Sequence, residues 1–134
     1  MSHFTTVETH ISDLEILKAA LEDLKFVVES NETQVVWIKG WQDNEIPVDL
    51  AVSIKGCEYG IGFKKTAHNL YEIVADWWGI EQIAGISQKM FVNQLTQRYA
   101  YHKVLAEVKK QGFLVAENRV EKDQSIRLVL RKWS

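Results

Sequence analysis

The strongest constraint on the fold is a change of hydrophobic period along the chain. After Ser12, leucines recur at steps of three and four, which predicts an amphipathic helix. From Phe26 to Ile54 the period becomes two, the pattern of half-buried strands. A second helical pattern starts at Ser87, a good N-cap, and runs to Gln111, where Gly112 is placed to end it. The chain therefore combines helices and strands in separate runs.

The remaining elements follow from β-forming residues and from turn residues between them. Residues 40–47 are expected to form a polar loop that contains Trp41 and is closed by the only proline. A short helix is expected over residues 80–86. The predicted strands cover residues 3–11, 26–29, 33–39, 48–55, 59–63, 70–78, 113–120 and 125–133.

This order predicts an α+β fold, with two main helices on one face of a mostly antiparallel sheet. A ferredoxin-like split βαβ core with extra strands is the expected version. The 134 residues contain no linker, repeat or low-complexity segment, so one domain over 1–134 is expected.

Three local patterns give sharper expectations. Ser12 and Glu15 have the spacing of a capping box, with Ser12 as the N-cap. Strict alternation predicts that Val48, Leu50, Val52 and Ile54 share one face of a strand. Glycines at 60 and 62 leave one face of their strand bare, which indicates that a helix or an aromatic side chain packs closely there. A ligand against these glycines is the weaker alternative, because the third glycine of a dinucleotide fingerprint is missing.

Charge and composition exclude several classes of function. The chain has 16 basic and 18 acidic residues, a balance that disfavours the basic surface needed to bind DNA. No apolar run is long enough to span a membrane, and no membrane insertion is expected. Cys57 is the single cysteine, which rules out an internal disulfide and favours a reducing compartment.

Five tryptophans are many for this length. On the strand expected at 70–78, Trp77 and Trp78 point to opposite faces, and the parity of Tyr71 and Ile73 predicts that Trp77 is the more buried. Trp78 is then an exposed aromatic of the kind that dominates binding interfaces. Trp41, in the polar loop, is a second candidate of this kind.

Polar residues interrupt the apolar stripe of the long helix. Arg98 and His102 lie one turn apart and face the same way as the core residues, close to Tyr99. The favoured interpretation is structural, with Arg98 reaching the sheet edge and His102 bonded to a backbone carbonyl. The alternative is an open groove in which Arg98 meets an acidic group and His102 acts as a ligand or proton carrier. Asp76 fits either an acid/base role or a cap before Gly79.

No convincing catalytic or metal-binding constellation is present. The four histidines are scattered without the spacing that fixes two ligands on one element, so no metal and no cofactor are predicted. Cys57 lies in an expected turn without an activating neighbour. Arg131 belongs to a small basic and aromatic strip on the last strand, which is interpreted first as a solvated edge and second as a contact for an acidic partner or single-stranded RNA.

Several segments of the sequence resemble the hypothetical chloroplast reading frame thirty-five family. This is a domain-of-unknown-function family of cyanobacteria and red-algal-type plastids. The resemblance covers essentially the whole chain, and it rests on residues 2–6, 71–79, 94–105 and 125–131. It implies a cytoplasmic or stromal protein of a photosynthetic lineage, and it carries no site residues.

Two hypotheses of function follow. The first is a non-enzymatic accessory or assembly factor that binds a protein partner through Trp78, Asp76 and Trp41, with Arg98, Tyr99, His102 and Arg131 as further contacts. RNA and a second copy of the chain stay open as partners. The second hypothesis is a small-ligand or catalytic domain that uses a helix-on-sheet groove around Arg98 and His102.

Overall fold

The structure, a computed structural model, describes residues 3–30, 34–120 and 126–132. In chain order its elements are β1 (Thr5–Glu8), α1 (Leu14–Asp23), β2 (Val27–Ser30), β3 (Val36–Lys39), the short 3-10 helix η1 (Trp41–Asp43), β4 (Glu45–Val48), β5 (Leu50–Ile54), β6 (Cys57–Lys65), β7 (Tyr71–Ala75), α2 (Trp77–Ala84), α3 (Gln88–Lys110), β8 (Phe113–Val120) and β9 (Ile126–Lys132).

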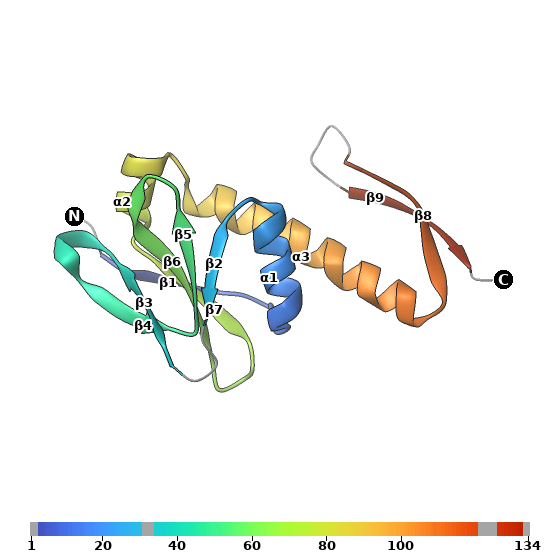
Figure 1. Ribbon diagram of the computed structural model, residues 1–134, viewed down its shortest axis with the longest axis horizontal. Helices are drawn as coiled ribbons and strands as arrows, with labels where there is room; N and C mark the ends of the chain where they lie inside the picture. The colour runs from blue at the N-terminus through green and yellow to red at the C-terminus, as the bar shows by residue number, and fades with distance from the viewer. Residues whose placement is uncertain (1–2, 31–33, 121–125, 133–134) are drawn as a thin grey trace.

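Five of the strands form one antiparallel sheet in the order β1-β7-β6-β5-β2 (Figure 1). The predicted α+β class is therefore confirmed. The ferredoxin-like refinement is not shown by this order, because the β1–α1–β2 unit is split by the three strands β5, β6 and β7. This meander forms from consecutive strands joined by short turns, and Gly56, at φ 79°, supplies the left-handed residue between β5 and β6.

The core lies between the sheet and the helices. Leucines of α1 that recur at helical spacing, Leu17 and Leu21, are fully buried against the sheet, as their pattern predicts. From the sheet, Ile61 and Phe63 reach the same layer. α3 runs across α1 in Figure 1 and contributes Phe91, Leu95 and Tyr99 to this core.

The start of α1 differs from the capping box expected in the sequence. Asp13 is the N-cap, and its Oδ1 accepts a hydrogen bond from the Ile16 N–H at 3.0 Å. Ser12 lies one residue too early, and its own N–H donates to the hydroxyl of Tyr99 instead. Both residues are good cap formers, and in the structure Asp13 takes this role.

A β3–β4 hairpin covers part of the other face of the sheet (Figure 1). The bare strip at Gly60 and Gly62 is filled by aliphatic side chains, since a Cβ added at Gly62 would lie 2.4 Å from Val48 Cγ1. Close packing against these glycines is thus confirmed, although a strand hairpin supplies it rather than a helix or an aromatic ring. The loop expected over residues 40–47 is wrong in its second half, because β4 begins at Glu45.

The single face predicted for the strand at 48–55 is confirmed for Leu50, Val52 and Ile54 and wrong for Val48. β4 ends at Val48 and β5 begins at Leu50, and the bend at Asp49 resets the alternation. Val48 consequently packs in the hairpin layer with Ala51, whereas Leu50 and Val52 face the helices. Alternation holds within a strand but not across a change of strand.

The C-terminal part follows the sequence closely. Ser87 caps α3 by accepting from the Met90 N–H at 3.1 Å, and Gly112, at φ 82°, lies just beyond the helix end. β8 and β9 pair as a separate antiparallel hairpin, as predicted. In Figure 1 this hairpin lies at the far end of α3, away from the five-stranded sheet.

Candidate functional site

The end of the molecule that carries α2 is organised by one buried carboxylate. Asp76 follows the last residue of β7 and is fully buried. Its Oδ1 accepts from the Gly79 N–H at 3.2 Å, which caps α2, and its Oδ2 accepts from the Trp41 N–H at 3.0 Å. A single side chain therefore ties η1 to the start of α2. Asp76 fills the capping role that the sequence allowed, and it offers no surface for direct contact with a partner.

The expected strand over residues 70–78 is wrong at its C-terminal end. β7 stops at Ala75, and Trp77 and Trp78 form the first turn of α2. Trp77 is nonetheless 6% exposed and Trp78 54% exposed, so the predicted order of burial is confirmed. The reason is a rotation of about 100° between neighbours in a helix rather than alternation in a strand.

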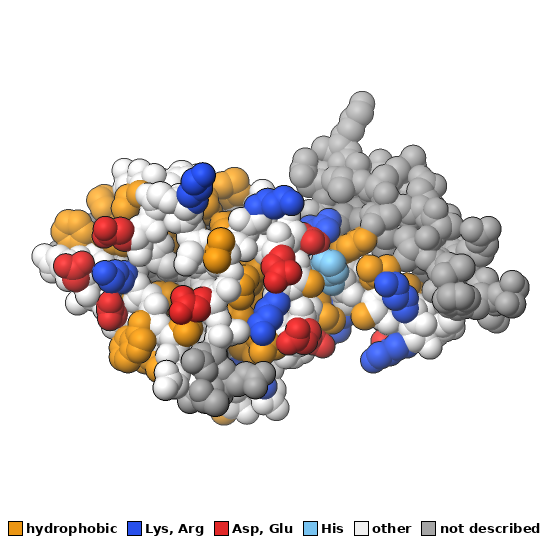
Figure 2. Space-filling view, in the orientation of Figure 1, with side chains coloured by type: hydrophobic (Ala, Val, Ile, Leu, Met, Phe, Trp, Pro, Cys, Tyr) orange, Lys and Arg blue, Asp and Glu red, His pale blue; other side chains and the backbone are white. Residues whose placement is uncertain are grey.

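We use the name tryptophan patch for the two exposed side chains of Trp78 and Trp41, the latter 44% exposed. Their segments are adjacent because Asp76 bonds to both of them. Figure 2 shows hydrophobic side chains gathered at the end of the molecule that carries α2 and the β3–β4 hairpin. Behind the patch, the Tyr59 ring packs so closely on Gly79 that an added Cβ would lie 2.0 Å from it. Desolvation, and to a smaller extent the charge of Asp76, raise the pKa of Tyr59 above its ordinary value.

Arg98 and His102 converge on a third residue that the sequence did not single out. Asp23, the last residue of α1, accepts from Arg98 Nε at 3.2 Å and lies 2.5 Å from His102 Nε2. Arg98 Nη2 forms a second, closer bond to the same oxygen. Partial burial raises the pKa of Asp23, but the hydrogen bonds and charges of Arg98 and His102 outweigh it, and the net pKa lies below the ordinary value.

Neither structural partner expected for these two helix residues is correct. Arg98 does not reach for the sheet edge and His102 does not bond a backbone carbonyl, because both are occupied by Asp23. Arg98 does meet an acidic group, as the alternative required, but this group belongs to the chain itself. All three side chains keep about a quarter to a third of their surface, with exposures of 25% for Arg98, 22% for His102 and 33% for Asp23.

Tyr99 is buried, and its hydroxyl makes hydrogen bonds within the fold. Its hydroxyl accepts from the backbone N–H groups of Ser12 at 3.2 Å and Asp13 at 3.1 Å. Burial raises the pKa of Tyr99, but these donors outweigh it and lower the pKa overall. α3 is thereby bonded to the beginning of α1 through Tyr99 and to its end through Arg98 and His102. Arg131, the last predicted contact, is part of β9, and its side chain lies outside the described residues.

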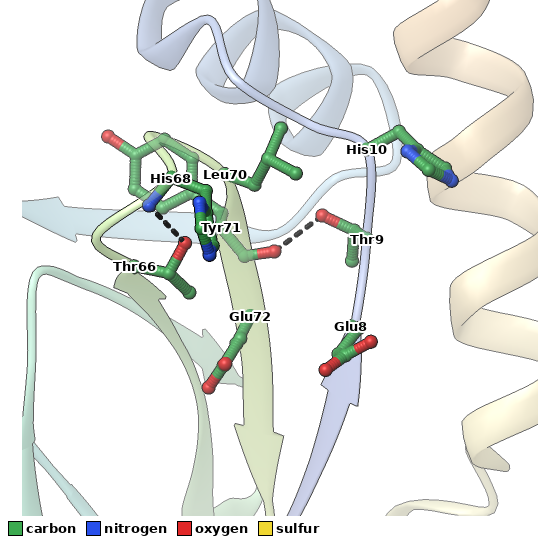
Figure 3. A pocket seen from close by; sticks show the side chains of 8 residues that line it. All are labelled: Glu8, Thr9, His10, Thr66, His68, Leu70, Tyr71 and Glu72. Carbon is green, nitrogen blue, oxygen red and sulfur yellow. Dashed lines mark hydrogen bonds between the residues drawn. The ribbon is translucent and has the colours of Figure 1, made fainter.

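Sequence reasoning missed a surface cleft next to β1. It has a volume of about 360 Å³ and lies where β1 and β7 run side by side (Figure 3). Glu8 and Glu72 are register partners there, and His10 and His68 point to different sides of the cleft in Figure 3. Thr9 and Thr66 are already bonded to the backbone of Tyr71 and His68. Because these residues are far apart in sequence, only the strand pairing could have revealed the cleft.

The predicted site residues do not line this cleft. Its lining includes none of the tryptophan patch and neither Arg98 nor His102. Burial, with the charges of Asp49 and Asp13, raises the pKa of Tyr71, so this phenol is a poor base.

Within residues 3–30, 34–120 and 126–132, no group of three or more histidine, cysteine, aspartate or glutamate residues is placed to hold a metal ion. In the same part of the chain, no helix is long and apolar enough to cross a membrane.

Comparison with known proteins places the chain in a family. Residues 20–129 match the model of a protein family of unknown function, DUF1257. Three relatives are each named "Uncharacterized protein ycf35". The one from Pyropia yezoensis is 37% identical and the alignment covers 100% of this chain and 99% of the relative. Those from Cyanophora paradoxa and Guillardia theta are 36% and 33% identical, and each alignment covers 99% of this chain and 98% of the relative.

No solved structure matches the chain. The family match spans well over half of the sequence, and the relatives align along nearly their whole length. On these matches, the chain belongs to the DUF1257 family, together with the ycf35 proteins of plastid-bearing algae.

Proposed function

We propose that this protein is a non-enzymatic accessory or assembly factor that binds a protein partner through the tryptophan patch. The observation that carries the proposal is the pair of indoles, Trp41 and Trp78, held exposed on two segments that share the carboxylate of Asp76. Tryptophan is enriched among residues that dominate binding energy. Backbone segments that are held by hydrogen bonds to Asp76 also lose little conformational freedom on binding.

The polar residues among the predicted contacts support the same proposal, because most of them are hydrogen-bonded or ion-paired to other residues of the chain. Asp76 and Tyr99 are buried and accept backbone N–H groups. Arg98 and His102 are both paired with Asp23. A catalytic constellation needs a reactive group and a base that open onto the same pocket. Relatives in plastid-bearing algae favour the cytoplasm of a cyanobacterium or the stroma of a plastid as its compartment.

The test is recovery of a partner from a native extract of a photosynthetic cell, with and without crosslinking. The wild-type chain is expected to retain a stoichiometric protein, and the double variant Trp41→Ser/Trp78→Ser is expected to lose it. Val104→Ser, which alters an exposed apolar residue of α3 at 46% exposure, is the matched control and should retain the partner. Equal recovery on all three proteins would refute a role for the patch, and no partner on the wild type would refute the function.

The alternative is a small-ligand or catalytic site at Arg98 and His102. The observation in its favour is the partly exposed Arg98–Asp23–His102 cluster, in which a carboxylate orients a histidine. A metabolite screen by thermal shift would distinguish it. This alternative expects a ligand whose stabilising effect disappears in His102→Gln, while the tryptophan variants respond as the wild type does.

A further inference from the structure

The β3–β4 hairpin leaves one strand edge open. β3 pairs only with β4, and its other edge has no strand neighbour in the described sheets. The Gly40 N–H donates to the Asn44 carbonyl at 2.8 Å, which fixes the alternation of bonded pairs along the hairpin. By this alternation Ile38 is in a bonded pair, and Trp37 and Lys39 are not, so the backbone groups of Trp37 and Lys39 point toward the open edge. Pro47, which has no N–H to give, sits opposite Trp37 as this pattern requires.

The residues of this edge line another cleft. This cleft has a volume of about 220 Å³, and its lining includes Trp37, Ile38 and Lys39 of β3, Glu45 of β4 and residues of β2, β5 and β6. Trp37 is 57% exposed. An aromatic side chain and free backbone donors and acceptors therefore lie along one hollow, which is the arrangement that strand-adding peptides use.

The charge of the cleft is negative. Its lining contains three glutamates, Glu29, Glu45 and Glu58, against the single cation Lys39, which is the register partner of Glu45. None of these three glutamates has an ion pair with any residue that the structure describes. Figure 2 shows acidic groups beside hydrophobic ones at this end of the molecule. Such a surface repels phosphate and attracts ammonium or guanidinium groups.

We infer that the open edge of β3 binds an extended, lysine- or arginine-bearing segment of a partner protein, which adds as a strand beside Trp37 and Lys39. A cationic side chain of that segment lies against the Trp37 indole, where the ring face attracts it, and between Glu29 and Glu58. Lys39 disfavours indiscriminate strand pairing at the same edge, as edge lysines commonly do. This inference rests on the proposed protein-binding function and supplies the chemistry of the partner.

The experiment uses the full chain, labelled with ¹⁵N, and an acetylated and amidated nine-residue peptide of alternating threonine and lysine. At low salt, titration is expected to shift the indole N–H signal of Trp37 and the amide signals of Trp37 and Lys39. The double variant Glu29→Gln/Glu58→Gln should weaken binding by about fivefold, because two exposed charge pairs are lost. Glu81→Gln, an exposed glutamate on α2 outside this cleft, is the matched control and should bind as the wild type does.

Three results of the peptide titration would overturn the inference. They are shifts confined to other residues, equal affinity for a peptide with glutamate in place of lysine, and equal affinity of the double glutamate variant. A dimer in sedimentation analysis that the double variant abolishes would also overturn it, because the edge would then be occupied by a second copy. A negative peptide titration would refute this inference but not the proposed function. The proposed function is tested separately, by whether the Trp41→Ser/Trp78→Ser variant fails to recover the native partner.

Discussion

At the scale of single residues, the buried carboxylate of Asp76 accounts for the geometry of the tryptophan patch. It satisfies the backbone N–H of Gly79, three residues away, and the backbone N–H of Trp41, 35 residues away. Removing it leaves both the cap of α2 and the Trp41 N–H without a partner. Asp76→Ala is therefore expected to lower the free energy of unfolding by about 2–4 kcal/mol, the sum of a lost cap and an unsatisfied donor. Urea unfolding measures this, with the exposed Glu81→Ala as a control that should change it by less than about 0.5 kcal/mol.

The two adjacent tryptophans should differ sharply in their effect on stability. Trp77 packs against Phe91 with ring centroids 5.5 Å apart, so Trp77→Ala should cost about 3–5 kcal/mol. Trp78→Ala should cost less than about 1 kcal/mol because its side chain is 54% exposed. The indole N–H of Trp77 is buried without a partner among the described residues, so Trp77→Phe should be milder than Trp77→Ala. Denaturant unfolding of the three variants tests this order, which equal midpoints for Trp77→Ala and Trp78→Ala would contradict.

The sequence could predict which tryptophan is buried but not why. Both a strand and the first turn of a helix separate the directions of neighbouring side chains, so the same order of burial fits either element. The carboxylate that decides between them, Asp76, bonds to Trp41, and no local pattern reports a contact across that distance. Asp23 was missed for the same reason, since its partners lie 75 and 79 residues away.

At the scale of elements, helices and strands were predictable where one period holds throughout the element. The leucine spacing of α1 and the Ser87 and Gly112 boundaries of α3 are local signals, and the structure bears them out. The hairpin β3–β4 was half missed because its second strand contains Pro47 and follows a polar turn, both of which resemble a loop. Its packing on the glycines of β6 is a tertiary property that only the fold reveals.

That packing gives a prediction for the hairpin. In Gly62→Ala the new Cβ would lie 2.4 Å from Val48 Cγ1 and 3.1 Å from Ile38 Cδ1, so the hairpin must shift away from the sheet. The expected loss of stability is about 1–3 kcal/mol, typical of an overpacked core. Adding Val48→Ala to Gly62→Ala should recover part of this loss, whereas Val48→Ala alone should destabilise. A double-mutant cycle by urea unfolding measures the coupling, and strictly additive effects would show that the two residues do not touch.

The crossing of α1 and α3 gives a prediction for pH. Because the folded pKa of Asp23 is lowered, its pairing with Arg98 and His102 stabilises the fold fully above the unfolded carboxyl pKa of about 3.9. This contribution is lost as the pH falls through the lower, folded pKa. Asp23→Asn should therefore be less stable than the wild type at pH 7, and the difference should shrink below about pH 4. Thermal unfolding from pH 7 to pH 3 tests this, with Glu22→Gln as the neighbouring control.

At the scale of the whole molecule, the fold has two unequal parts. The buried residues of both hydrophobic clusters in the described side chains lie between Ile11 and Tyr99. β8 and β9 form their own two-stranded sheet, which Figure 1 places at the far end of α3. A hairpin alone is marginally stable, so it contributes little to the cooperative unfolding of the rest.

The last prediction concerns that division. A chain ending at Gly112 keeps the five-stranded sheet, the β3–β4 hairpin and all three α-helices, including the bonds from α3 to both ends of α1. It should therefore unfold in one cooperative transition with a midpoint within about 5 °C of the full chain, which corresponds to roughly 1 kcal/mol for a domain of this size. Calorimetry of the two chains measures the difference. A truncated chain that fails to fold would show that the hairpin is part of the cooperative core, and that the helix–sheet layer is not sufficient by itself.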